Sequence, residues 1–516
     1  MDPSFRNLCL NSLVFLSLYA CLVQSVEIIG CRSLCNNSYG TGNVRFAEHN
    51  TNGSSNHSVN ITALRNDTSQ SPLEGWTPEP NGRGTLTVIY GCCSTIFLCC
   101  WCVLCINVPP INWGRWRRIH EKALVACMGG LGPEFVFQLA LGQWVSARGS
   151  VDDFKRSGYE KWSMTHAFLA DMGGFVLHAG DFPDFPLNAK QVHYLVTHGY
   201  VPYSAVAINA RVISEKNKGG GLVRFITVCQ ILWFSLNSIA RVAQGLDLTT
   251  MELSTLSFMI CTVGTYVLWA SKPMDTENPI VIEPNTTIAD IVVRAGPRAQ
   301  EPYSSTPLDF VCRERSSWYL YWTYWMNMVR KLRLMYPIKR GPIDMIPDDN
   351  FPPLSGPTLG VLFLFQASYA AVPICGWNYV FPTNTESLLW RISTAYTLGA
   401  ITLYWIVDLY SWRLHSAVKK LAGRRTMKPD PERIIPATQS HRNFRARRVA
   451  ARLRNNSSLY DPHMDIPLKA LIPVTLLGIG YMAARAYVIL EDWMSFRALP
   501  PGAYATVNWS AFLIHF

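Results

Sequence analysis

The chain has 516 residues, of which 49% are hydrophobic and only 16% are charged, and its formal net charge is +11. An average soluble protein carries about 25% charged residues, so this composition argues against an ordinary soluble protein. Stretches of about 20 nearly uncharged residues recur along the chain, which is the length that a helix needs to cross a bilayer. The basic residues gather between Ser411 and Ile466, and no base-reading motif accompanies them, so nucleic-acid binding is not expected.

The first 25 residues have the pattern of a secretory signal peptide. Arg6 precedes an apolar run from Leu8 to Val23, and Ser25 follows near the expected cleavage site. An uncleaved signal anchor is the alternative interpretation. Both interpretations predict that the chain enters the secretory pathway.

Residues 26–84 form a polar segment rich in Asn, Ser and Thr. Five N-glycosylation sequons begin within it, at Asn36, Asn52, Asn56, Asn60 and Asn66. Five sequons after a signal sequence predict a disordered, glycosylated segment on the luminal side of the membrane. A further sequon begins at Asn508, near the C-terminal end.

Residues 85–516 contain the apolar segments and predict an all-α fold, a polytopic transmembrane helical bundle of about six or seven spans. The clearest segments are 85–108, 225–246, 253–269, 357–376, 389–410 and 467–490. The first of them carries six cysteines between Cys92 and Cys105, which invites a metal-site interpretation. Thiols spread around a lipid-embedded helix pack as small hydrophobic groups, however, so we expect no metal there.

The region between residues 123 and 179 is apolar but interrupted. Gly129, Gly130, Gly132 and Pro133 break its first segment, and its second segment, 164–179, is too short to span comfortably. The two segments either form an in–out pair or both dip in from the cytoplasm, and the sequence leaves both possibilities open.

Basic loops predict the orientation of the bundle. The loop with Arg115, Arg117 and Arg118 and the segment from Ser411 to Ile466 are both expected on the cytoplasmic side. This assignment agrees with a luminal N-terminus if residues 123–179 make no net crossing. Residues 318–335 mix Trp and Tyr with basic residues, which predicts a helix in the headgroup layer; an aromatic core helix of a soluble domain is the alternative.

Part of the chain resembles a known group of proteins. Residues 210–273, which begin ARVISEKNKGGG and end YVLWASKP, together with ADMGGFVL and the closing VNWSAFLIHF, resemble a family of fungal multi-pass membrane proteins over roughly residues 100–516. The family usually has DKSKGD where this chain has EKNKGG, so Glu215, Asn217 and Gly220 depart from its pattern. A subset of the family is similar to integral membrane terpene cyclases of meroterpenoid biosynthesis, and the resemblance implies a role in fungal specialised metabolism.

Glu134 and Asp171 are the candidate catalytic residues, because both lie in short segments interrupted by glycine. Ionisable groups at membrane depth are costly, and broken helices are tolerated there where they line a cavity. A protonated carboxyl group in such a cavity could protonate an olefin or epoxide, and nearby aromatic rings would stabilise the carbocation. In the alternative interpretation, Glu134 caps a broken helix and Asp171 binds a neighbouring helix.

His178, Asp181 and Asp408 are further polar candidates. The first two, with Asp184, could bind Mg²⁺ or Zn²⁺, but their spacing matches no strong motif, and we expect neither a metal nor a cofactor. Arg241 and Glu252 flank a tight turn between two helices and are expected to pair.

These features predict a membrane-embedded terpene cyclase that protonates the polyprenyl tail of a lipophilic precursor. A non-catalytic protein or scaffold of a biosynthetic pathway and a small-molecule transporter are the alternatives. The expected partners are a lipophilic small molecule, membrane lipid and other membrane-bound pathway enzymes, in the endoplasmic reticulum or the plasma membrane.

Overall fold

The computed structural model describes residues 73–79, 82–110, 113–209, 220–274, 276, 278–299, 301, 303–312, 316–332, 342–410, 466 and 468–512. The predicted signal peptide, the five sequons from Asn36 to Asn66 and the basic residues between 411 and 465 lie outside the described residues. The described part is mostly helical, as the composition and the long apolar segments predicted.

Five helices in the described part are long and apolar enough to cross a membrane. They are α2 (Thr85–Phe97) with a π-helical continuation, α9 (Gly220–Ala243), α10 (Thr250–Leu268), α13 (Pro357–Ala371) with a 3-10 continuation, and α17 (Leu468–Met494). A further helix, α14 (Asn384–Asp408), packs along α17 but is more polar and is not among the five. The described part of the structure therefore has five helices that could span a membrane, and the one or two further spans expected from the sequence remain a prediction.

Two helices, α3 (Arg115–Leu131) and α4 (Pro133–Arg156), meet at an angle of 114°. The break falls where the sequence predicted it, at Gly132 and Pro133, because proline ends the helix before it and can begin a new one. The far part of α4 returns to where α10 ends, since Gln143 accepts hydrogen bonds from Trp269 Nε1 at 3.1 Å and Lys272 Nζ at 2.8 Å.

A small sheet corrects the prediction of an all-α fold. It contains β1 (Phe175–Ala179), β2 (Phe182–Leu187) and β3 (Ile280–Ile282), in the order β2-β1-β3. β1 pairs antiparallel with β2 and parallel with β3, so Phe175 lies opposite both Leu187 and Ile280.

The second apolar segment, 164–179, is therefore not one helix that dips into the membrane. It divides into α5 (Met164–Asp171) and β1, joined by a turn in which Gly173 has a φ of 77°. Only glycine adopts this left-handed conformation without strain. The sequence prediction was wrong here because the periodicity of a short apolar run does not separate a buried strand from a helix.

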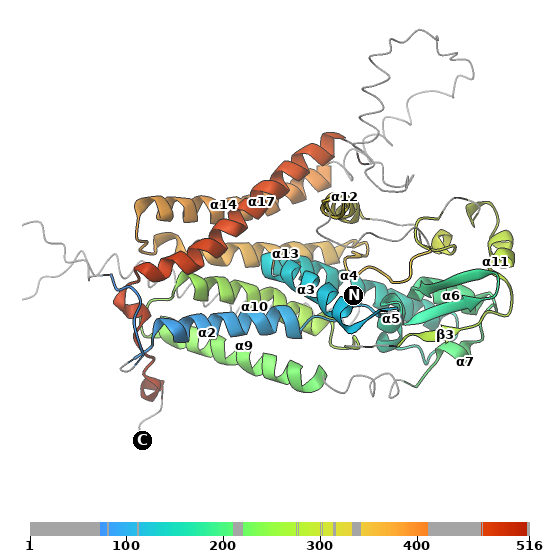
Figure 1. Cartoon of the computed structure of the whole chain (residues 1–516), viewed down its shortest axis with the longest axis horizontal. Helices are drawn as coiled ribbons and strands as arrows, with labels where there is room; N and C mark the ends of the chain where they lie inside the picture. The colour runs from blue at the N-terminus through green and yellow to red at the C-terminus, as the bar shows by residue number, and fades with distance from the viewer. Residues whose placement is uncertain are drawn as a thin grey trace, which may run out of the picture.

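Three helices complete the region around the sheet: α6 (Ala189–Thr197), α7 (Tyr203–Val206) and α11 (Ile288–Ala295). A further helix, α12 (Ser317–Lys331), follows in the chain. α12 matches the predicted aromatic helix, and it lies beside the ends of α14 and α17 (Figure 1). Trp318, Tyr321, Trp322 and Tyr324 on this helix are buried. Its aromatic side chains therefore pack against the rest of the protein.

The two ends of the described chain meet at the end of the bundle that is opposite the sheet (Figure 1). We call the end of the bundle where the two chain ends meet the terminal end, and the end that carries the sheet the sheet end. Glu74 pairs with Leu499 in an isolated β-bridge, which joins the segment before α2 to the segment after α17.

Arg241 and Glu252, which were predicted to pair, act on each other electrostatically, but their direct contacts at the terminal end are with other groups. Glu252 forms an ion pair with Arg83. Arg241 donates to four backbone carbonyls at 2.7–3.0 Å, those of Asp247, Gly502, Ala503 and Ala505. Asp247 lies in the turn itself, but Arg83 and residues 502–505 are far from it in sequence, so the local pattern could not identify them.

Candidate functional site

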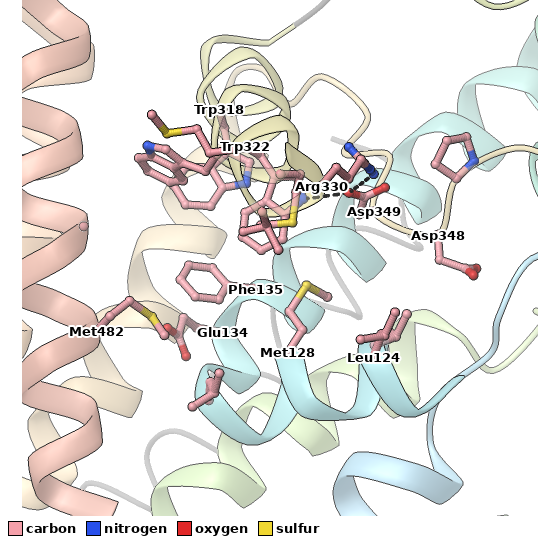
Figure 2. Close-up of a pocket in the computed structure, with 18 of the residues that line it drawn as sticks. Leu124, Met128, Glu134, Phe135, Trp318, Trp322, Arg330, Asp348, Asp349 and Met482 are labelled. Carbon is pink, nitrogen blue, oxygen red and sulfur yellow. Dashed lines mark hydrogen bonds and ion pairs between the residues drawn. The ribbon is translucent and has the colours of Figure 1, made fainter. Parts of the chain in front are cut away.

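A cavity of about 770 Å³ lies between α3, the first turn of α4, α12, α14, α17 and the loop that precedes α13 (Figure 2). Sites for small organic ligands have volumes of about 300–1,000 Å³. α3 contributes one face to it, because its lining residues lie three or four positions apart: Arg117, Glu121, Leu124, Met128 and Leu131. This face extends about 21 Å along the helix, so the cavity is elongated.

Aromatic rings form one wall of the cavity. Phe135 stacks on Trp318 with ring centroids 5.5 Å apart, and it also contacts Trp322 at 5.7 Å and Tyr481 at 6.0 Å. Trp318 in turn meets Tyr404 of α14 edge to face at 5.4 Å. Faces of aromatic rings attract cations, so this wall suits a ligand that is apolar or that develops positive charge.

Glu134 lies at the deep end of the cavity, and its side chain is nearly inaccessible to solvent. Its Oε1 accepts a hydrogen bond from the hydroxyl of Tyr481, while its Oε2 has no hydrogen-bond partner in the described part of the chain. The break at Gly132 and Pro133 places this carboxyl group in the first turn of α4, where backbone N–H groups favour negative charge.

Arg485 is a buried cation that acts electrostatically on Glu134. Its Nε donates to the carbonyl of Leu131 at 3.4 Å, and its guanidinium carbon lies 5.1 Å from the ring of Tyr369 and 5.8 Å from that of Phe258. Its Nη2 has no hydrogen-bond partner among the described residues. An acid and a phenol therefore line the deep end of the cavity, and a buried cation outside the lining acts on the acid.

The opposite end of the cavity is charged and lies at the sheet end. Asp349 Oδ2 lies 3.4 Å from Arg330 Nη2 and accepts a hydrogen bond from Trp322 Nε1 at 3.2 Å (Figure 2). Asp348 Oδ1 accepts from the backbone of Asn107 at 2.5 Å, and burial raises the pKa of this carboxyl group to about 7. The cavity thus fits an elongated apolar ligand with one polar end.

Asp171, the second carboxylate predicted from the sequence, does not line this cavity. It ends α5, and its Oδ1 accepts a hydrogen bond from the backbone of Ala189 at 3.0 Å, at the start of α6. Burial raises its pKa. The structure therefore does not bring Glu134 and Asp171 together, and the contacts of Asp171 are those of a residue that joins two helices.

The other polar candidates lie apart from the cavity and from one another. His178 pairs with Asp184 at 2.7 Å on the exposed β1–β2 hairpin. Asp181 accepts from the backbone of Ile288 at 3.1 Å and of Ala289 at 3.0 Å, which caps α11. Asp408 accepts from the hydroxyl of Ser317 at 2.6 Å. Within the described ranges, no three His, Cys, Asp or Glu side chains are grouped so that they could hold a metal ion.

The sequon at Asn508 is exposed at the terminal end. Its side-chain Oδ1 accepts a hydrogen bond from the hydroxyl of Ser510 at 2.6 Å. Glycosylation there stays a prediction.

No local sequence pattern marks Tyr481, Arg330 and the aspartates at the charged end as members of one site. Tyr481 is 347 positions from Glu134, and nothing in its own segment marks it as a partner of a carboxyl group. The aromatic content of α12 was recognised, but its place in the wall of a cavity was not. Such contacts depend on the packing of helices that are distant in sequence.

A protein-family model described as a family of unknown function (DUF8562) matches residues 58–293. The chain is therefore similar to that family over a region that includes α3 and α4 and ends before α12. No curated protein and no solved structure matches the chain.

Proposed function

We propose that the protein is a membrane-embedded terpene cyclase that acts on a lipophilic precursor with a polyprenyl tail. One observation carries the proposal. The carboxyl group of Glu134, which accepts a hydrogen bond from Tyr481, is buried in the wall of an elongated cavity lined by aromatic rings. The resemblance to fungal membrane proteins of specialised metabolism supports the same reaction class.

The proposed membrane arrangement has six crossings, by the five apolar helices and by α14. The α3–α4 pair enters from the sheet end and returns to it, so it makes no net crossing. Six crossings agree with the placement of both described ends of the chain at the terminal end (Figure 1). The terminal end would be luminal, and the sheet end, with the basic start of α3, would be cytoplasmic in the endoplasmic reticulum or plasma membrane.

The cavity would hold the substrate with its polar end at the charged mouth and its tail along α3. The acid form of Glu134 would protonate the last olefin or a terminal epoxide of the tail. Electron pairs of the following olefins would then form the ring C–C bonds, and the last carbocation would lose a proton to water, which restores an olefin. The product is an isomer of the substrate, and Glu134 is left as a carboxylate.

The aromatic wall and the low polarity of the cavity have defined roles in this reaction. Phe135, Trp318 and Trp322 present ring faces to the carbocations, which lowers the energy of these intermediates. The aromatic and apolar side chains around the tail shield the cation from early capture by water. Tyr481 orients the carboxyl group through its hydrogen bond.

The test is an assay with microsomes from yeast that expresses the chain. Farnesylated phenols and quinones, with and without a terminal epoxide, are incubated with the microsomes and analysed by chromatography with mass detection. We expect a product of unchanged mass and shifted retention time that is absent with empty-vector microsomes.

Absence of conversion across the panel, with the protein confirmed in the membrane, would contradict the proposal. In that case recovery of pathway enzymes with the purified protein would favour a scaffold. Flux of a small molecule across vesicles that contain the protein would favour a transporter.

A further inference from the structure

A line of buried polar side chains runs from Glu134 toward the terminal end of the bundle, away from the mouth of the cavity. On α17 and the turn after it, the line comprises Tyr481, Arg485, Asp492 and Ser495. These residues are 4, 7 and 3 positions apart, so they share one face of the helix, and none is more than 7% exposed. The line covers about 21 Å from its first member to its last.

Two other helices add polar groups to this line. From α10, the hydroxyl of Thr250 lies 3.0 Å from that of Ser495, and Ser254 is a polar neighbour of Asp492. From α13, Tyr369 faces Arg485. Arg485 acts electrostatically on both Glu134 and Asp492, so it connects the two carboxyl groups. We call these residues the α10–α17 polar path.

Two members of the path have a buried polar atom without a hydrogen-bond partner among the described residues, Glu134 Oε2 and Arg485 Nη2. Ser254 acts on Asp492, and Tyr481 on Tyr369, as a hydrogen-bonding neighbour, but Ser254 Oγ, Asp492 Oδ1 and Tyr369 OH make no hydrogen bond of normal geometry within the described part. Native proteins pair nearly all buried polar atoms, and they use ordered water where protein groups do not suffice. These atoms, on α4, α10, α13 and α17, therefore indicate ordered water along the path.

We propose that the α10–α17 polar path returns a proton to Glu134 from the terminal end after each turnover. The inference rests on the proposed function, in which the initiating step leaves this residue as a carboxylate while product still fills the cavity. Asp492 passes the proton inward, and Arg485, which keeps its own proton, orients the water between the two carboxyl groups. In each turnover the path delivers one proton to Glu134, and the last carbocation releases one proton to water. The number of protons taken up therefore equals the number released.

The first test separates proton supply from chemistry. In Asp492→Asn and, separately, Ser254→Ala, a single turnover uses the proton already on Glu134, so we expect its rate to be unchanged. Continued turnover needs resupply, and we expect it to slow by about a hundredfold in Asp492→Asn, the lower end of the effect of positioned proton-transfer groups. Thr262→Val removes a buried hydroxyl elsewhere on α10 and serves as the matched control.

The second test does not depend on cyclisation. Infrared difference spectroscopy of the purified protein in deuterated buffer follows the carboxyl C=O band that Glu134→Gln removes. We expect its hydrogen–deuterium exchange to be slower in Asp492→Asn than in the wild type and in Thr262→Val. This result in a protein that forms no isomer would support the path and contradict the cyclase.

Two outcomes would overturn the path. One is exchange and turnover in Asp492→Asn that match the wild type. The other is an equal loss of single-turnover and continued-turnover rates, because Asp492 would then position Glu134 and not supply its proton. Ser254→Ala keeps the test decisive if Asp492→Asn does not fold, since it removes only one hydroxyl from the path.

Discussion

The break between α3 and α4 and the junction between α5 and β1 have nearly the same sequence pattern. Each is a short apolar stretch in which paired glycines lie close to one carboxylate, Glu134 or Asp171. In the structure the two carboxylates have different surroundings. Glu134 faces a cavity, with a phenol from α17 as its partner, while Asp171 accepts from the backbone of α6.

The surroundings of the two carboxylates differ because different helices pack against them. The first turn of α4 meets α12 and α17, which lie more than 180 positions further along and leave space between their aromatic and apolar side chains. The end of α5 meets α6, which follows it closely and covers the carboxylate. A buried carboxylate is costly and therefore indicates a functional or structural role. The residues that pack on it decide which of the two roles it has.

The largest expected effect comes from the amide variants of the two carboxylates. Glu134→Gln keeps the shape of the side chain but removes the acidic proton, so we expect cyclisation to fall by about a hundredfold to ten-thousandfold. Asp171→Asn keeps an oxygen that can accept from Ala189, so we expect most activity to survive. The measurement is the rate of isomer formation at equal amounts of membrane-inserted protein. Similar losses in both variants would contradict the assignment of a catalytic role to Glu134 and a structural role to Asp171.

The sequence allowed much of the fold to be predicted, because long apolar segments and the Gly132–Pro133 break are local signals. It also singled out Glu134, since a carboxylate next to a broken apolar helix is a local signal as well, and this residue lines the cavity. It could not separate Glu134 from Asp171, and it did not show the strand in Phe175–Ala179, whose pairing with Ile280 joins segments about 100 positions apart. Tyr481, Arg330 and Asp348 join the site only through tertiary packing.

A second prediction addresses stability at the α5–α6 junction. Asp171→Ala leaves the buried backbone N–H of Ala189 without its acceptor, which costs about 1–3 kcal/mol. We expect thermal unfolding in detergent, followed by tryptophan fluorescence, to shift to lower temperature in this variant and much less in Asp171→Asn. A variant with unchanged melting and no cyclisation would place Asp171 in the chemistry after all.

A third prediction concerns the aromatic wall beside Glu134. Trp318→Leu removes a ring face that would stabilise a carbocation, worth about 1–2 kcal/mol or about five- to thirtyfold in rate. Nε1 of Trp318 has no hydrogen-bond partner within the described ranges, so the change leaves no polar group there unsatisfied. Trp318→Phe keeps a ring and is the control, for which we expect a smaller loss in the same isomerisation assay. Equal rates in the two variants would mean that the wall only shapes the cavity.

Asp348 is intermediate between the two carboxylates, because it lines the cavity and also binds a backbone N–H, that of Asn107. Burial raises its pKa to about 7, against about 4 in an unfolded chain, so between these values the folded protein holds a proton that the unfolded chain has released. Folding stability should therefore fall as the pH rises through this window and level off above it. Lys272 opposes the shift, and Asp349 and Glu121 add to it.

The measurement that checks this smallest effect is the melting temperature between about pH 5 and about pH 8, which brackets the upper part of the window. We expect Asp348→Asn to melt with a weaker dependence on pH than the wild type. Glu160→Gln, on an exposed turn, should keep the wild-type dependence. If Asp348→Asn also keeps the wild-type pH dependence of melting, Asp348 is a charged carboxylate over this whole pH range. The mouth of the cavity would then be more negative than the burial of Asp348 predicts. A polar end that donates hydrogen bonds would be favoured there over an anionic one, because the carboxylates at the mouth outnumber its arginines.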